Sequence, residues 1–170
     1  MRAAVTTLFC VTESVIKMFN LKNFFATILF TAMFFVNFTA SAENLAQERR
    51  GWELLNNLRA KYKVSAVSWN PNSNLQAAAR IRAQEISQKF SHDRPDGSSC
   101  FTVIRKIGIR YRACGENIAM GTNLGAERAM ELWTNSPGHF QNMVDGRFKE
   151  VAVASFRAGE NVYWVQLFIG

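Results

Sequence analysis

The apolar positions of the chain recur first at helical spacing and later at the spacing of strands. Four apolar residues recur at intervals of three or four within residues 44–62: Trp52, Leu55, Leu58 and Tyr62. A second set does so at comparable spacing within residues 70–90: Leu75, Ala79, Ile86 and Phe90. This period predicts two amphipathic helices that each bury one face. In the second helix we expect Arg80, Arg82 and Glu85 to lie largely off the apolar face.

Shorter patterns with their own start and stop residues follow the second helix. They predict a helix over 98–108, a strand over 114–121, a helix over 123–135 and one more helical turn over 136–144. Asn123 is the expected N-cap of the helix over 123–135, because its side chain can accept a hydrogen bond from a backbone N–H of the first turn. Ser136 and Pro137 suit the start of the last turn for the same reason and because proline fits the first helical position.

Two strands close the pattern. Residues 148–157 and 161–169 are rich in β-branched and aromatic side chains, and the Ala-Gly-Glu between them is a hairpin signal. The chain shows neither internal repeats nor a low-complexity tract. Helices on each side of a small sheet predict an α+β domain with α-β-α layers.

The first 42 residues are expected to be a secretory leader and not part of this domain. Residues 24–36 form an apolar run of 13 that follows two lysines and precedes Ala-Ser-Ala at 40–42. A basic start, a short apolar run and a small-residue exit are typical of a signal peptide. A membrane span needs roughly 20 apolar residues, so an uncleaved anchor is the weaker alternative. We expect the true start at Met18 and a mature domain over 43–170, secreted, or periplasmic in an organism with an outer membrane.

The charge changes this picture little. The formal net charge of +7 falls to +5 for residues 43–170, since three basic residues and one acidic residue leave with the leader. Arginine and lysine are spread along the sequence, which is typical of a solvated surface of mixed charge. The same field would also favour an anionic envelope polymer or a lipid headgroup. The sequence carries no nucleic-acid-binding signature.

Two cysteines remain after the leader is removed, Cys100 and Cys114. An even pair in an exported protein predicts a disulfide. The sequence contains neither a C-x-x-C pair nor a cluster of cysteine and histidine, so it gives no indication of a closed structural zinc site. We therefore expect Cys100 and Cys114 to be bridged.

The chain has only two histidines, and each lies where a helical pattern stops. His92 stands in FSHDRPDG, and His139 follows Ser-Pro-Gly. Either one alone has many ordinary roles at a surface. Together they can converge from two element ends on one cleft. Two imidazoles fill only half of a tetrahedral zinc site, so we expect at most a weakly held, exchangeable divalent cation such as zinc.

Two glutamates are candidate partners of these histidines. The predicted strand places Glu116 on an otherwise apolar face, where a carboxylate is costly unless it is paired. An ordinary ion pair of Glu116 with Arg110 or Arg112 is the alternative. Glu131 lies three residues after Arg128 on a predicted helix, so a common i,i+3 pair remains an equal alternative for it.

Four motifs in this order resemble the CAP superfamily of cysteine-rich secretory proteins, antigen 5 and pathogenesis-related 1 proteins: FSHDRPDGSSCF, CGENIAMG, ELWTNSPGHFQNMV and NVYWVQLF. The resemblance covers residues 43–170 and implies the SCP-domain fold, an α-β-α sandwich with a small central sheet. It also implies a cleft lined by two histidines and two glutamates: His92, Glu116, Glu131 and His139. With two mature cysteines and no cysteine-rich extension, the sequence resembles the compact bacterial secreted form.

Two functions remain open. The resemblance implies a monomeric extracellular binding module for a lipid, sterol, peptide or cell-envelope component, with peripheral membrane contact and without nucleic acid. The alternative is a protease-like hydrolase in which a histidine-bound cation activates water and Glu116 or Glu131 acts as general base. A third metal ligand and an oxyanion donor set are missing from that alternative. Asn142, three residues after His139, is expected to support the site structurally.

Overall fold

The structure, a computed structural model, describes residues 42–170, and one compact unit spans Asn44–Gly170. The predicted leader, apart from Ala42, lies outside the described residues. Within the part that is described, no helix is both long enough and apolar enough to cross a bilayer.

The described chain has the order of elements that the sequence predicts. The first helix is described over residues 42–61, and its part within the compact unit is called the 44–61 helix below. The elements that follow are α2 (Asn74–Gln88), α3 (Thr102–Lys106), β1 (Cys114–Thr122), α4 (Ala126–Thr134), α5 (Pro137–Met143), β2 (Glu150–Ala158) and β3 (Asn161–Ile169). The stretch 64–69 forms no strand and pairs only through a bridge between Ser68 and Glu150.

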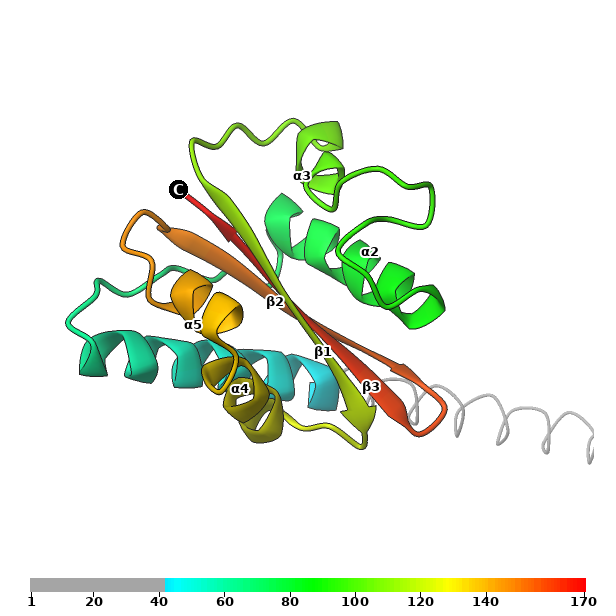
Figure 1. Ribbon diagram of the computed structural model, residues 1–170, viewed down its shortest axis with the longest axis horizontal. Helices are drawn as coiled ribbons and strands as arrows, with labels where there is room; N and C mark the ends of the chain where they lie inside the picture. The colour runs from blue at the N-terminus through cyan, green and yellow to red at the C-terminus, as the bar shows by residue number, and fades with distance from the viewer. Residues whose placement is uncertain (1–41) are drawn as a thin grey trace, which may run out of the picture. The chain divides into compact units, whose positions relative to one another are not determined.

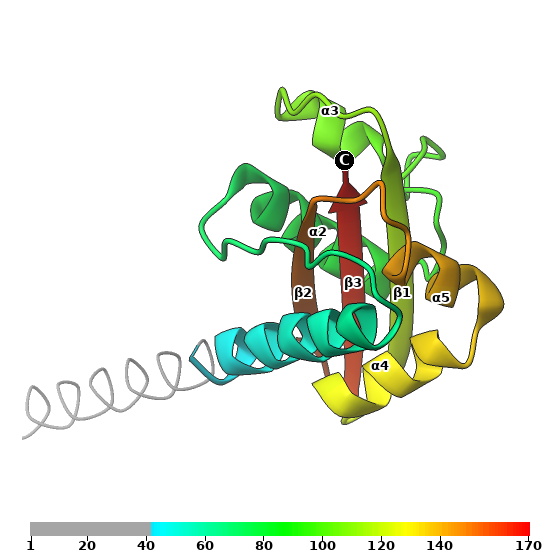
Figure 2. The same cartoon turned by 90° about the vertical axis from the view of Figure 1, so that its left-hand side faces the viewer.

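The three strands form one antiparallel sheet with β3 in the middle, in the order β1-β3-β2 (Figure 2). Helices α2 and α3 lie on one face, and the 44–61 helix, α4 and α5 lie on the other (Figure 1). The predicted α+β fold with α-β-α layers is therefore confirmed. Because β1 pairs only with β3, its other edge borders the helices and the loops between them.

Each face of the sheet has its own core. Alternate residues of β3 point to opposite faces, so Trp164 and Phe168 join one core while Val165 and Leu167 join the other. The first core gathers both fully buried tryptophans, Trp133 and Trp164. Burial on both faces explains why β3 is an almost continuous apolar run.

One buried cation ties the 44–61 helix to the rest of the first core. Arg59 has no exposed surface and donates hydrogen bonds to four backbone oxygens, those of Ser65 (2.7 Å), Met143 (2.8 Å), Asp145 (3.1 Å) and Phe148 (3.4 Å). Burial lowers the pKa of Arg59. Its donors are satisfied by backbone carbonyl groups, as a buried polar side chain requires.

The predicted cap of α4 is wrong. Gly125 occupies the N-cap position, while Asn123 has a positive φ of 48° and its side chain accepts a hydrogen bond from Arg157 (2.9 Å). The free N–H of Ala126 is satisfied by the Gln47 side chain at 3.0 Å. The cap therefore comes from the 44–61 helix, a tertiary partner that local sequence does not reveal.

The predicted disulfide is also wrong, because Cys100 and Cys114 are both free. The Cys100 thiol lies against Glu116, whereas Cys114 lies beside Tyr111. Glu116 and Cys114 are two residues apart on the same strand face, about 7 Å along β1. A bridge would need Cβ atoms only about 4 Å apart, and the two thiols instead have different neighbours.

A substitution at Gly115 would test how tightly β1 packs on the first core. A methyl group at Gly115 would lie 2.9 Å from the buried Phe148 ring and 3.2 Å from the Asn142 amide oxygen. We expect Gly115→Ala to lower the free energy of unfolding by about 1–3 kcal/mol, measured by urea denaturation, because the core must shift. Gly121→Ala, on the same face of β1, meets nothing closer than 3.6 Å and is expected to be neutral or slightly stabilising. Equal effects of the two changes would contradict this packing.

Candidate functional site

The two histidines meet at the free edge of β1, one from each helical layer. His92 lies in the loop after α2, and His139 lies in the first turn of α5. Their ring centroids are 6.3 Å apart and the rings are tilted by 48°. Glu116 reaches the same place from β1, with its side chain on the face that carries α2. The edge strand thus brings together residues that lie 47 positions apart in the sequence.

Glu116 is buried and fully engaged. Its side chain is 1% exposed, and its Oε2 accepts a hydrogen bond from Arg82 Nε at 2.7 Å. Its Oε1 accepts a second hydrogen bond from Arg82 Nη2 (3.3 Å) and one from His92 Nδ1 (2.9 Å). The carboxylate therefore has a charged partner on one side and an imidazole on the other, which is the condition for burying it.

Arg82 is the residue of the site that the sequence interpretation missed. It was expected off the apolar face of α2, yet its side chain has no exposed surface. It lies three residues after Ala79 and four before Ile86, so it occupies the buried face by spacing. That spacing indicates a buried position, but the charge of arginine favoured the prediction of an exposed one.

The same guanidinium holds the loop that carries His92. Arg82 donates to the Ser91 carbonyl at 2.9 Å and to Glu85 Oε2 at 2.8 Å. Glu85 also accepts from Arg94 Nε at 2.9 Å, and Arg94 donates to Thr102 at 3.2 Å. These bonds join α2, the 91–99 loop and α3 in one ion-pair network. His92 is thus held in place by the segments on both sides of it.

Two asparagines hold α5, and with it His139, against β1. Asn117 donates to the His139 carbonyl oxygen at 3.1 Å. Asn142 donates to the Asn117 side-chain oxygen (2.9 Å) and to the Glu116 carbonyl oxygen (3.3 Å). Asn142 thus positions the backbone of the site, and the described residues show no hydrogen bond between it and an imidazole.

Glu131 is exposed and is bonded to none of the other three candidates within the described residues. Its side chain is 56% exposed and pairs with Arg128, the ordinary i,i+3 pair that the sequence left open. In the part of the chain that is described, no hydrogen bond or ion pair joins Glu131 to His92, Glu116 or His139. The structure therefore brings together three of the four expected residues and adds Arg82.

The two imidazoles differ electrostatically. The hydrogen bond that His92 donates to Glu116 raises the pKa of His92 above its ordinary value, against an opposing contribution from burial. Burial lowers the pKa of His139, and the charge of His92 lowers it further. A carboxylate only accepts hydrogen bonds, so Nδ1 of His92 carries a proton in both charge states. Neutral His92 consequently presents the lone pair of Nε2.

Cys100 lies behind the site and is chemically quiet. Burial raises the pKa of its thiol to about 12, and the neighbouring Glu116 carboxylate adds to the shift. The thiolate is the nucleophilic form of cysteine. Cys100 is therefore a packing residue at neutral pH.

His92 and His139 are the two side chains here that could bind a metal ion. With Zn–N distances near 2.1 Å, a tetrahedral zinc ion places the centroids of two bound imidazole rings about 5 Å apart. The observed separation of 6.3 Å is wider, so the two rings would have to move closer together to share an ion. Glu116 would orient His92 from behind, an arrangement common for metal-binding histidines. A catalytic zinc has three protein ligands, but residues 42–170 contain no group of three or more potential ligands placed for an ion.

Comparisons with known proteins identify relatives in sequence and in fold. The family model described as "Cysteine-rich secretory protein family" (CAP) matches residues 52–168. The uncharacterized protein YkwD of Bacillus subtilis (strain 168) is 33% identical over 138 residues, which cover 79% of this chain and 52% of YkwD. The chain thus spans about half the length of that relative.

Solved structures share the fold. An extracellular protein containing an SCP domain from Bacillus anthracis superposes with a TM-score of 0.65 at 21% identity, over 74% of this chain and 41% of that one. An outer surface protein of Borrelia burgdorferi superposes with a TM-score of 0.62 at 18% identity, over 69% of this chain and 87% of that one.

Removing the buried cation is expected to destabilise the fold. Arg82→Met leaves the Glu116 carboxylate buried without its charged partner, so the free energy of unfolding should fall by about 3–5 kcal/mol. Arg128→Met removes an equally charged residue from an exposed pair and should cost no more than about 1 kcal/mol. Urea denaturation of both variants measures the difference. A cost for Arg82→Met as small as that for Arg128→Met would show that Glu116 does not depend on it.

The two histidines are expected to titrate in a fixed order. NMR titration should give His92 a pKa above 6.5 and His139 a pKa below it. The stabilisation from His92 is then full below pH 6.5 and is lost as the pH rises through its folded pKa. His139 acts oppositely, since its preference for the neutral form costs stability as the pH falls below 6.5. Glu116→Gln should lower the pKa of His92; an unchanged value would contradict the hydrogen bond.

Proposed function

The chain belongs to the cysteine-rich secretory protein (CAP) family, and on that basis we propose that it is an exported binding module. The two-histidine site at the edge of β1 is its ligand site. The ligand class is an apolar small molecule such as a lipid or sterol, a peptide, or another cell-envelope component. The protein acts as a monomer that can contact a membrane peripherally.

One observation carries this proposal: the site exposes imidazole and buries its carboxylate. The His92 side chain is 56% exposed, whereas that of Glu116 is 1% exposed. Imidazole nitrogens can donate or accept hydrogen bonds, so they suit a hydroxyl, carbonyl or carboxyl group of a ligand. Such a site recognises polar groups without offering a carboxylate to the solvent.

Two exposed apolar side chains on the segments that carry His92 and Glu116 support a ligand with an apolar part. Phe90, two residues before His92, is 47% exposed. Met120 is 40% exposed and points to the same face of β1 as Glu116. Exposed large apolar residues next to a few polar groups are typical of small-molecule sites. This combination favours a ligand whose polar end meets the imidazoles.

The hydrolase alternative is supported less well. A general base must be within reach of the water that it activates. Both oxygens of Glu116 are engaged by Arg82 and His92, and the exposed Glu131 pairs with Arg128. Neither carboxylate is placed for that role, so binding accounts better for the arrangement.

The binding proposal predicts a copurified ligand. Mass spectrometry of the natively purified protein should detect an apolar or peptide ligand that is retained after chelation and lost from a folded His92→Ala/His139→Ala variant. Glu131→Gln is the matched control and should keep the ligand, because the exposed Glu131 side chain pairs with Arg128. Turnover of ester or peptide substrates by the parent protein, abolished by a folded Glu116→Gln variant, would instead establish the hydrolase.

We further propose that a divalent cation such as zinc is held only by His92 and His139. Calorimetric titration of the chelator-stripped protein with Zn²⁺ should show one site, weaker than the roughly 10–16 kcal/mol of closed structural zinc sites. Heat should vanish in the double-alanine variant and remain in Glu131→Gln. An unchanged heat in the folded double variant would place the ion elsewhere.

A further inference from the structure

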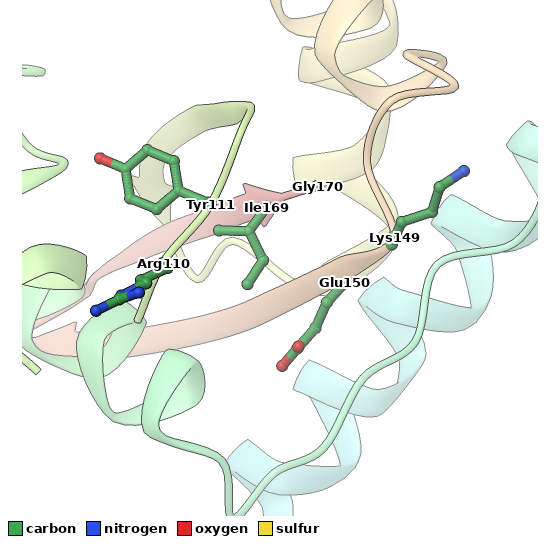
Figure 3. A pocket seen from close by; sticks show the side chains of 6 residues that line it. All are labelled: Arg110, Tyr111, Lys149, Glu150, Ile169 and Gly170. Atoms are coloured by element: carbon green, nitrogen blue, oxygen red, sulfur yellow. The ribbon is translucent and has the colours of Figure 1, made fainter. Parts of the chain in front are cut away.

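A second hollow lies at the end of the sheet where β1 and β2 begin and β3 ends. This pocket has a volume of about 170 Å³. It is lined by Arg110, Tyr111, Lys149, Glu150, Ile169 and Gly170 (Figure 3). None of these residues belongs to the histidine site. The pocket is therefore a separate candidate site.

Positive charge gathers around this pocket. Four exposed basic residues lie in or next to it: Arg105, Arg110, Arg112 and Lys149. Burial raises the pKa of Tyr111, and Arg105 is the nearby cation that opposes this rise. Arg112 adjoins the pocket through its backbone N–H, which donates to the Gly170 carbonyl at 2.7 Å.

These cations are short of acidic partners. The segment 97–115, which carries three of them together with Lys106, contains no acidic residue. Among the described residues, none of the four cations forms an ion pair, although the Lys149 ammonium donates to the Gly146 carbonyl at 3.1 Å. Glu150 is the single acidic side chain in the lining. The net positive charge thus remains available to an external anion.

Backbone hydrogen bonds fix the walls of the pocket. Gly170 accepts from Arg112 and from Ala113 (3.0 Å), and its own N–H donates to Ala113 at 3.0 Å. The Lys149 N–H donates to the Ile169 carbonyl at 2.9 Å. The segments that carry the cations are therefore ordered in advance, which reduces the entropy lost on binding.

We propose that this basic pocket binds an extended anionic polymer through its phosphate groups. Arg110 and Lys149 extend to opposite sides of the pocket and not toward one point (Figure 3). A single small anion could not meet both, whereas successive phosphates along a chain can. The Ile169 side chain lies between them and can contact the less polar part of each repeat.

The test compares two double variants that remove the same charge. Binding of long-chain inorganic polyphosphate to the purified protein is measured by fluorescence anisotropy over a series of salt concentrations. Arg110→Gln/Lys149→Gln should weaken binding about tenfold or more and reduce the salt slope by about 1.5, since each phosphate contact contributes about 0.7–0.9. Lys61→Gln/Lys89→Gln, two exposed lysines outside the pocket, should bind like the parent.

Other outcomes would overturn the proposal. One is no polyphosphate binding by the parent at low salt, and another is equal weakening in both double variants, which would indicate net charge alone. Monomeric phosphate binding as tightly as the polymer would indicate a small-anion site. Tight binding to phosphatidylglycerol vesicles without binding to polyphosphate would indicate a lipid surface.

A further variant separates this pocket from the histidine site. His92→Ala/His139→Ala should still bind polyphosphate like the parent, and a loss of binding in this folded variant would contradict a separate site.

Discussion

The buried pair of Arg82 and Glu116 is the interaction on which the site depends. It joins the middle of α2 to the edge strand β1 in a region where neither side chain can reach water. Removing two charges from water is costly, and the pair is supported by further hydrogen bonds of Arg82 to Glu85 and Ser91 and of Glu116 to His92. The ion pair therefore determines the orientation of His92 as well as the packing of α2.

The edge of β1 that does not pair with β3 is where the residues of the site come together. An unpaired edge exposes backbone groups that can recruit another strand. Here the outward carbonyl of Glu116 accepts from Asn142 (3.3 Å) and that of Ile118 accepts from Trp133 (3.0 Å). These bonds satisfy the edge and also dock α4 and α5 against it. The same contacts that protect the edge bring His139 to the far side of Glu116.

The elements were predictable because their periods are strong, but several partners were not. The spacing of apolar residues predicted α2, β2 and β3, and the family motifs predicted the pairing of the two histidines. Arg82 was misplaced because charge was given more weight than spacing, although a long side chain can bury its guanidinium beside a carboxylate. The cap of α4 and the state of the cysteines depend on tertiary contacts between residues distant in sequence. The basic pocket was missed because Arg110 and Lys149 are 39 positions apart and meet only through β3.

The burial of Glu116 has a consequence for how such a site can be used. A carboxylate held by a guanidinium and an imidazole has little freedom to move toward a substrate, and it instead fixes the tautomer and the angle of His92. The exposed nitrogen of that ring then points outward as a fixed hydrogen-bonding group. Rigid presentation of a neutral or charged imidazole suits recognition, and the lower pKa of His139 keeps the second ring neutral while the first is charged. At mildly acidic pH the pair thus combines one cationic donor with one neutral ring, so an anionic or carbonyl oxygen is the group that it would hold best.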